Sequence, residues 1–149
     1  MQKLKLLLLS YILLISCGSF NNKIIKTSNN SPIFIIQKGA CYGSCPIYTI
    51  TLSSDRLVTY HGKRYVENQG IYEWYIASRR FNQILDIIDS SFNFSNSYNL
   101  EAQDLPVTTI KISDNHIIKY KGACPVVFSN ELQIIEKLLF ENANWKFPK

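Results

Sequence analysis

The sequence lacks the residue patterns that mark most enzymes. It contains no Gly-rich phosphate-binding loop, no Gly-x-Ser-x-Gly nucleophile motif and no pair of carboxylates at a catalytic spacing. Only two of its 149 residues are histidine, and only one pair of cysteines is closely spaced, whereas structural zinc sites usually combine two such pairs. These absences favour a non-catalytic protein, and we expect neither a cofactor nor a metal.

Dense clusters of basic residues are also missing. Lysine and arginine together number 16 against 11 acidic residues, but the only adjacent basic pairs are Lys63-Arg64 and Arg79-Arg80. Proteins that bind nucleic acids concentrate basic residues on one face or along one helix. The net charge of +5 is therefore interpreted as a solvated surface, and no nucleic-acid partner is expected.

The first hydrophobic run is too short to span a membrane. It covers residues 6–15, follows a short basic segment at residues 1–5, and leads into the order Leu-Ile-Ser-Cys that ends at Cys17. A basic segment before such a run is typical of a secretory signal peptide. The ending resembles a bacterial lipobox, which implies cleavage before Cys17 and lipidation of that cysteine. The alternative is an ordinary signal peptide with an incidental cysteine.

The segment after Cys17 is polar. Residues 18–31 read GSFNNKIIKTSNNS, a composition typical of a flexible tether, which would reach about 20 Å as a random coil. We predict a lipoprotein signal peptide at residues 1–16, the lipidated Cys17 and its tether at 17–31, and a single domain at 32–149. The lipid anchor makes a membrane the expected partner. Because no Asp follows Cys17, the predicted location is the outer membrane of the bacterial cell envelope, facing the periplasm.

Two stretches of the chain are similar to each other. Residues 46–62 and 106–122 align without a gap, and six of the 17 positions are identical, including a Pro at the start and a Gly at the end of each stretch. Both alternate apolar and polar residues on either side of an Asp-containing turn, which is the pattern of a β-hairpin. An internal duplication is favoured over shared hairpin patterning alone.

A helix is predicted after each hairpin unit, and two further strands are predicted at residues 33–36 and 71–76. Ser78 suits the N-cap of the first helix and Pro125 suits the first turn of the second. The predicted fold class is α+β: an antiparallel sheet of five to seven strands built from two β-hairpin/helix repeats, with two helices packed on one face. The predicted apolar faces are Phe81, Ile84, Leu85, Ile88 and Phe92 in the first helix, and Phe128, Leu132, Ile135 and Leu139 in the second.

Three cysteines remain if Cys17 carries lipid. An odd number of cysteines in an exported domain predicts one disulfide and one free thiol. The residues alone leave the pairing open. A bridge from Cys41 to Cys45 closes a small loop worth roughly 2 kcal/mol, and a bridge from either one to Cys124 closes about 80 residues and would contribute about 4.5 kcal/mol.

Two other uses of the cysteines are weaker. Thiol–disulfide exchange by Cys41 and Cys45 conflicts with their Cys-x-x-x-Cys spacing and with the strand predicted after them, because redox proteins place Cys-x-x-Cys at a helix N-terminus. A metal site would combine the three cysteines with His61 or His116, but the second close pair is missing. The aromatic residues Tyr65, Tyr72, Trp74 and Tyr75 could line a binding surface, although packing within the fold is favoured for them.

The stretch GACYGSCPIYTITLSSDRLVTYHG, with the later Asp-Leu-Pro at 104–106 and Gly122, resembles a family of bacterial lipoproteins and exported proteins called domain of unknown function 6438. The family pattern runs Cys-aromatic-Gly-x-Cys-Pro-x-Tyr, then a hairpin ending in Tyr-x-Gly, a helix, and an Asp-x-Pro before a second hairpin. The resemblance covers about residues 34–140 and implies a disulfide between Cys41 and Cys45, because Cys124 is not a family position. The residues that fit the motif are Cys41, Tyr42, Gly43, Cys45, Pro46, Tyr48, Tyr60, Gly62, Asp104 and Pro106.

The family has no assigned activity, so the resemblance implies a fold and a cellular context but no reaction. Its first hairpin usually turns at Asp-Gly, whereas this chain has Asp55-Arg56, which leaves the turn type open. We expect a membrane-anchored lipoprotein that acts as a non-catalytic binding or envelope-associated module for an unknown protein or small-molecule ligand. The alternative is a thiol–disulfide redox protein that uses Cys41 and Cys45.

Overall fold

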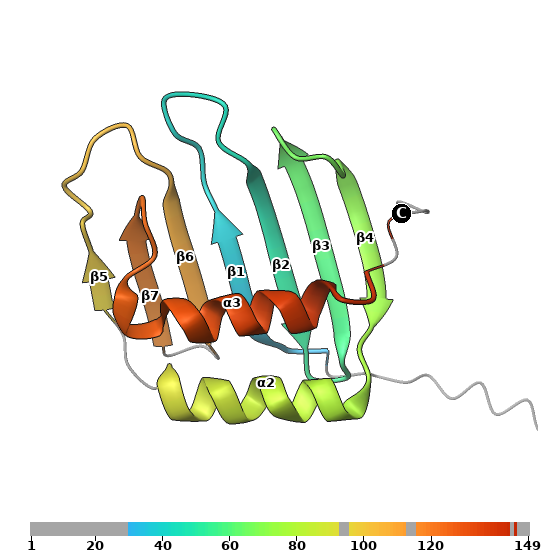
Figure 1. Ribbon diagram of the computed structural model, residues 1–149. Coiled ribbons are helices and arrows are strands. Elements are labelled where there is room, and N and C mark those ends of the chain that lie inside the picture. Colours follow the sequence, from blue (N-terminus) through green and yellow to red (C-terminus); the bar gives the residue numbers. More distant parts are fainter. Residues whose placement is uncertain (1–29, 93–95, 113–115, 144, 146–149) are drawn as a thin grey trace, which may run out of the picture.

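The computed structural model describes residues 30–92, 96–112, 116–143 and 145. These residues form one sheet of seven strands, with two helices on one face of it (Figure 1). Within them, neither helix is long and apolar enough to cross a membrane. The signal peptide, Cys17 and nearly all of the tether lie outside the described residues. The elements in chain order are β1 (Pro32–Lys38), β2 (Ile47–Ser53), β3 (Leu57–Arg64), β4 (Gly70–Tyr75), α2 (Ser78–Ser91), β5 (Asn96–Tyr98), β6 (Val107–Ile112), β7 (His116–Lys121) and α3 (Val126–Phe140).

The sheet is mostly antiparallel, and its strand order is β4-β3-β2-β1-β6-β7-β5. Every neighbouring pair is antiparallel except β5 with β7, which is parallel. The predicted α+β class and the strand number at the upper end of the predicted range are confirmed. Strand β5 has only three residues, Asn-Ser-Tyr, so it carries no apolar alternation by which a strand could be recognised.

The first strand of the domain lies at the centre of the sheet, between the two hairpins. On β1, Ile36 is opposite Ile50 of β2 on one side and opposite Ile110 of β6 on the other. These two partners are 60 residues apart, which is the offset at which the two stretches of sequence align. The pairings within the hairpins differ slightly, because β2 pairs Leu52 with Val58 whereas β6 pairs Ile112 with His116.

The sequence left open the type of turn between β2 and β3, and in the structure this turn contains a left-handed residue. Arg56 has a φ of 72°, a left-handed conformation that costs a non-glycine residue about 1 kcal/mol. Its Nη1 atom donates a 2.7 Å hydrogen bond to Ser78 Oγ, and its carbonyl accepts one from the Ile76 N–H. The prediction of Ser78 as an N-cap was therefore wrong by one residue: its hydroxyl is bound to Arg56, and Ala77 occupies the cap position.

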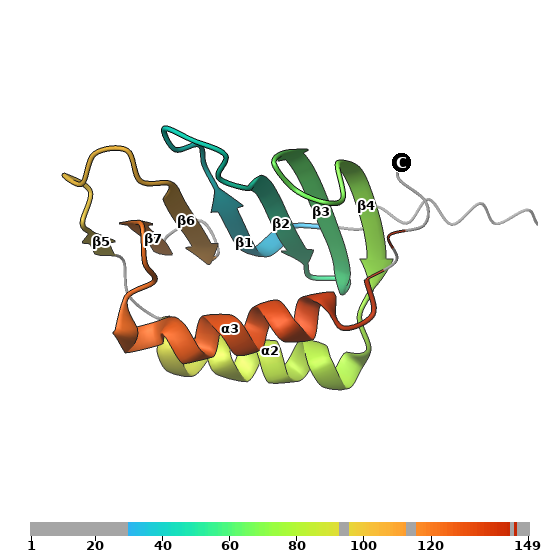
Figure 2. The same ribbon diagram turned by 45° about the horizontal axis from the view of Figure 1, so that its top comes forward.

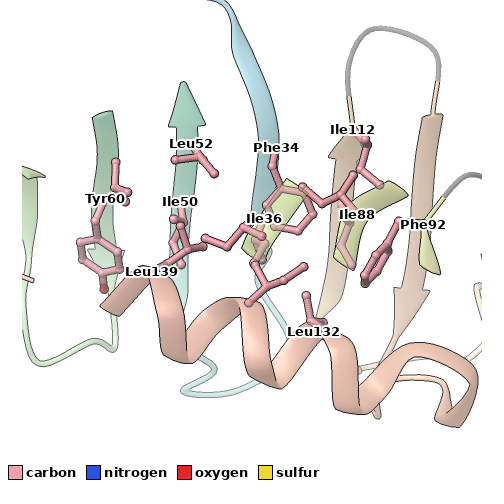
Figure 3. Close-up of a cluster of buried hydrophobic side chains, with 14 of the residues drawn as sticks. Phe34, Ile36, Ile50, Leu52, Tyr60, Ile88, Phe92, Ile112, Leu132 and Leu139 are labelled. Carbon is pink, nitrogen blue, oxygen red and sulfur yellow. The ribbon is translucent and has the colours of Figure 1, made fainter. Parts of the chain in front are cut away.

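Both helices bury the predicted apolar faces against the sheet. Figure 2 shows the sheet as one layer and α2 and α3 together as the second layer. In the core, side chains from the helices meet alternate residues of the strands (Figure 3). Trp74 links the layers further, because its Nε1 donates a buried 2.9 Å hydrogen bond to the Leu139 carbonyl near the end of α3. The buried residues are Ile84 and Ile88 on α2, Phe92 directly after it, and Phe128, Leu132, Ile135 and Leu139 on α3.

Candidate functional site at the loop end of the sheet

The residues that fit the family motif gather at one end of the sheet. Strands β1, β3, β5 and β7 run in the same direction, so their carboxyl ends lie together, at the top of Figure 1. We call this the loop end: it comprises the connections at residues 39–46, 65–69, 99–106 and 122–125. Motif residues in or beside these connections are Cys41, Tyr42, Gly43, Cys45, Pro46, Tyr48, Gly62, Asp104 and Pro106.

The connection between β1 and β2 is closed by a disulfide. Cys41 and Cys45 are bonded to each other, with their Cα atoms 5.8 Å apart, which is the pairing that the resemblance implied. The base of this loop is held to β6, because the Gly39 N–H donates a 2.8 Å hydrogen bond to the Val107 carbonyl. Tyr42, at the tip, is 89% exposed. The bridge therefore presents an aromatic side chain to solvent on a short, constrained loop.

The connection between β3 and β4 folds back over Gly62. A Cβ atom at this position would collide with the Asn68 carbonyl and with Val66, so only glycine fits beneath the loop. The loop is also fixed by the Tyr72 hydroxyl, which donates a 3.1 Å hydrogen bond to the Gln69 carbonyl. Its first residue, Tyr65, is half-exposed and left-handed, with a φ of 55°. The loop is thus held in one position beside the end of α3.

An aromatic pocket of about 310 Å³ lies between this loop and the end of α3. It is shallow and open to solvent. The motif residues Tyr48 and Tyr60 form part of its wall, and the Tyr60 ring lies 5.0 Å from that of Trp145 at an interplanar angle of 84°. The same Tyr60 ring lies 6.0 Å from Phe140 at 72°. The lining residues are Tyr48, Tyr60, Val66, Glu67, Asn68, Phe140 and Trp145.

A partly buried ion pair supports one wall of the aromatic pocket. Lys38 Nζ lies 3.7 Å from Glu136 Oε1 and 5.5 Å from the centre of the Tyr48 ring. Burial by itself lowers the pKa of Lys38, but Tyr48 and Glu136 outweigh it, so the pKa is raised and the ammonium stays charged. Burial raises the pKa of the Tyr48 hydroxyl, although Lys38 partly offsets the effect. The contact between the Lys38 ammonium and the Tyr48 ring therefore helps to hold Tyr48 in the wall of the pocket.

The third cysteine lies on the other side of β1 from the aromatic pocket. Cys124 is a free, half-buried thiol just before α3, and its Sγ lies 3.8 Å from the Pro125 carbonyl. Burial raises its pKa, and the neighbouring Tyr120 hydroxyl lowers it only in part. A raised pKa leaves little thiolate at neutral pH, so Cys124 is placed as a packing residue rather than as a nucleophile.

The other sequence-derived positions do not join the aromatic pocket. Asp104, with a φ of 60°, and Pro106 form the base of the β5–β6 connection, where the Gly122 N–H donates to the Pro106 carbonyl. His61 is exposed on β3, and His116 begins β7 at the opposite end of the sheet. In the part of the chain that the structure describes, no three His, Cys, Asp or Glu side chains come together as metal ligands.

Several residues of the aromatic pocket were not singled out from the sequence. Phe140 and Trp145 follow the apolar face of α3, and Glu67 and Asn68 lie in a loop with no recognisable motif. Their sequence neighbours carry no spacing that relates them to Tyr48 or Tyr60. The one available signal was the dense aromatic content, which packing explains equally well.

The architecture defines the class of the protein: it is an α+β domain with a single sheet, two helices on one face of the sheet and a loop closed by a disulfide. Within that class, the chain belongs to the family described as Domain of unknown function (DUF6438), whose model matches residues 32–142. The comparison with curated proteins gives no match. The family membership that the Cys-Tyr-Gly-x-Cys-Pro stretch suggested is thus shown, and it carries no assigned reaction.

Proposed function

We propose that the protein is a lipid-anchored binding module of the cell envelope and that the loop end of the sheet is its binding surface. The observation that carries the proposal is the aromatic pocket. Side chains from separate elements form this pocket, and it lies at the end of the sheet where the motif residues gather. Pockets lined by aromatic side chains with a few polar groups are typical ligand sites. Exposed apolar residues of this end add to the surface: Tyr42, Tyr65, Leu100 and Leu105.

The anchor rests on the signal sequence and on Cys17. When the full chain is produced in a Gram-negative host, we expect the purified protein to lack residues 1–16 and to carry at least two acyl chains, because a single chain holds a protein on a membrane only marginally. Intact-mass spectrometry and phase partitioning into detergent measure both features. The Cys17→Ala variant is the control and should stay unprocessed. A protein that is cleaved but carries no acyl mass would contradict the anchor.

The alternative function is thiol–disulfide exchange at Cys41 and Cys45, and the exposed position of their loop is the observation in its favour. The chemical setting is unfavourable, because β2 follows the pair where a redox enzyme has a helix N-terminus to stabilise a thiolate. A structural role is therefore preferred: the bridge would limit the freedom of the unfolded loop and hold Tyr42 outward.

Replacing Cys45 with serine separates these two functions. As a structural bridge closes a five-residue loop, the variant should lose about 2 kcal/mol of unfolding free energy, measured by urea denaturation. Before reduction, the denatured wild-type domain should show one alkylatable thiol, from Cys124, and three after reduction. Cys124→Ser is the matched control and should keep the bridge. Reduction of insulin by the wild type that the Cys45→Ser variant cannot perform would support the redox function instead.

We infer further that the two hairpins derive from one duplicated unit. The supporting observations are the gapless alignment of residues 46–62 with 106–122 and the position of their first strands on either side of Ile36. A helix also follows each hairpin, after one additional strand in the first unit and directly in the second. The duplicated unit would then consist of a hairpin and a helix, and the two copies would pair with opposite edges of the central strand β1.

A further inference from the structure

A second pocket lies at the end of the domain opposite the loop end. Its volume is about 350 Å³, and it is enclosed by the C-terminal half of α2, the start of β1, the end of β6 and the start of β7. We call it the α2 pocket. Figure 3 shows three of its residues, Ile88, Phe92 and Ile112, on the same side of the core cluster.

The walls of the α2 pocket are apolar and already in place. Five of its seven lining residues are apolar. Ile88, Phe92 and Ile112 are buried in the core, whereas Ile33 and Leu85 are only half-buried and leave apolar surface open to solvent. Walls held by the core need little reordering when the pocket is filled, which preserves affinity. A cavity of about 150 Å³ holds benzene, so the α2 pocket has room for two branched aliphatic side chains.

The surface beside the α2 pocket is negative. From Ile84 to Ser91 the charged residues are Asp86 and Asp89, both are exposed, and the last turn of α2 contains no basic residue. Asp89 itself lines the pocket, where the other polar residue is His116. The C-terminal end of a helix adds partial negative charge. In a chain of net charge +5, this pocket therefore suits an apolar segment that is flanked by positive charges.

The tether contains a segment of this kind. Residues 23–26 read Lys-Ile-Ile-Lys, so two lysines enclose the one adjacent pair of apolar residues in the tether. These residues lie outside the described part of the chain. The tether joins the domain at Pro32, directly before Ile33 in the wall of the α2 pocket. Ile25 precedes Ile33 by eight positions, and such a stretch can span up to about 26 Å, which is enough for the chain to turn back.

We propose that residues 23–26 dock in the α2 pocket, with Ile24 and Ile25 in its apolar interior and the flanking lysines beside Asp89. This inference goes beyond the proposed binding function and does not involve the aromatic pocket. Docking leaves residues 18–22 between the lipidated Cys17 and the domain, which reduces the reach of the tether from about 20 Å to about 12 Å. Because β1 begins at the end opposite the loop end, docking also holds the loop end away from the membrane.

Limited proteolysis tests the docking, because trypsin cleaves after Lys26 only while the segment is released. The full chain is added to phosphatidylcholine vesicles, whose zwitterionic surface attracts lysine weakly, and cleavage is followed by intact mass. A synthetic peptide of residues 18–31 gives the cleavage rate of an undocked segment. We expect cleavage in the chain to be at least about ten-fold slower than in the peptide, because release exposes two isoleucine side chains to water. The measurement does not require lipidation, so a failure of the proposed anchor leaves it interpretable.

The Ile24→Ser/Ile25→Ser double variant removes the apolar anchors. Compared with a peptide of its own sequence, we expect it to lose at least about five-fold of the protection. Asn21→Ser/Asn22→Ser is the matched control, because it changes two polar residues of the same tether, and it should keep the protection. Equal cleavage rates in the wild-type chain and its peptide would overturn the proposal.

The Asp89→Lys variant tests the pocket side of the contact. We expect it to reduce the protection about three-fold by repelling the two lysines. The fold should be kept, because Asp89 is exposed and a basic residue is favourable near a helix C-terminus. Glu101→Lys reverses an exposed charge on the β5–β6 connection at the loop end, and it is the control that should change nothing.

Two other occupants would give different results. Protection that depends on the isoleucines but is unaffected by Asp89→Lys would place the segment in the membrane and overturn docking in the α2 pocket. Protection that falls when the protein is diluted over more vesicles would mean that the segment of a neighbouring copy fills the pocket, and it would overturn docking within one chain. Protection that is independent of dilution and reduced by both variants would support the proposal.

Discussion

Replacing Gly62 with alanine should lower the unfolding free energy by about 3 kcal/mol, because a methyl group would be forced into a packed backbone. The added Cβ would collide with the Asn68 carbonyl, would lie 2.8 Å from Tyr60 Cε1 and would press on Val66. The carbonyl belongs to the β3–β4 connection, so the loop would have to lift away from β3. Urea denaturation gives the free energy, and the quenching of Trp145 fluorescence by iodide reports any opening of the aromatic pocket.

The matched control is Gly43→Ala in the disulfide loop. Gly43 belongs to the same motif, but a Cβ atom there meets only Cys41 Sγ, at 3.9 Å, which is an ordinary contact. We expect a change below about 0.5 kcal/mol. A loss at Gly62 as small as that at Gly43 would show that the β3–β4 connection adapts easily, and the explanation of Gly62 by packing would then be wrong.

Replacing Phe128 with alanine should cost about 3–5 kcal/mol, because the side chain is fully enclosed and its loss would leave a large cavity. Its ring centre lies 5.5 Å from that of Phe92, 5.9 Å from Tyr98 and 6.0 Å from Tyr120. Phe128 therefore joins α3 to β7, to the short strand β5 and to the residue that follows α2. Differential scanning calorimetry measures the loss.

Val127→Ala tests whether the effect of Phe128 comes from burial. Val127 is the neighbouring residue in the first turn of α3 and is 66% exposed, so its truncation removes little packing. We expect less than about 0.5 kcal/mol for this variant. A loss of similar size at both positions would mean that the start of the helix, and not the ring cluster, determines the stability.

The sequence predicted the elements of this fold better than their arrangement. Alternation identified the strands of both hairpins, because each has one face in the core, and helical spacing identified the buried residues of α3. Strand β5 was missed since three polar and aromatic residues carry no period. The central position of β1 could not be predicted either, because its pairing with β6 joins segments about 70 residues apart in the chain.

The candidate site was predicted only in part. The resemblance pointed to Tyr48, Tyr60 and Gly62, which do lie at or beside the aromatic pocket. The pairing of Cys41 with Cys45 was open from the residues, since chain entropy favoured the longer bridge to Cys124. Phe140 and Trp145 reach the pocket because α3 crosses the sheet towards β3 and β4, and this is a tertiary relation without a local signal in the sequence.

The central position of β1 has a consequence for the order in which the domain can assemble. As the chain emerges from its N-terminus, β1 to β4 can pair in sequence as a meander, but one edge of β1 stays unpaired until β6 has emerged. An unpaired hydrophobic strand edge invites pairing with other chains. The strand that is made first therefore waits for its second partner until β6 has emerged, and this non-local pairing slows folding and leaves the edge of β1 exposed to aggregation in the meantime.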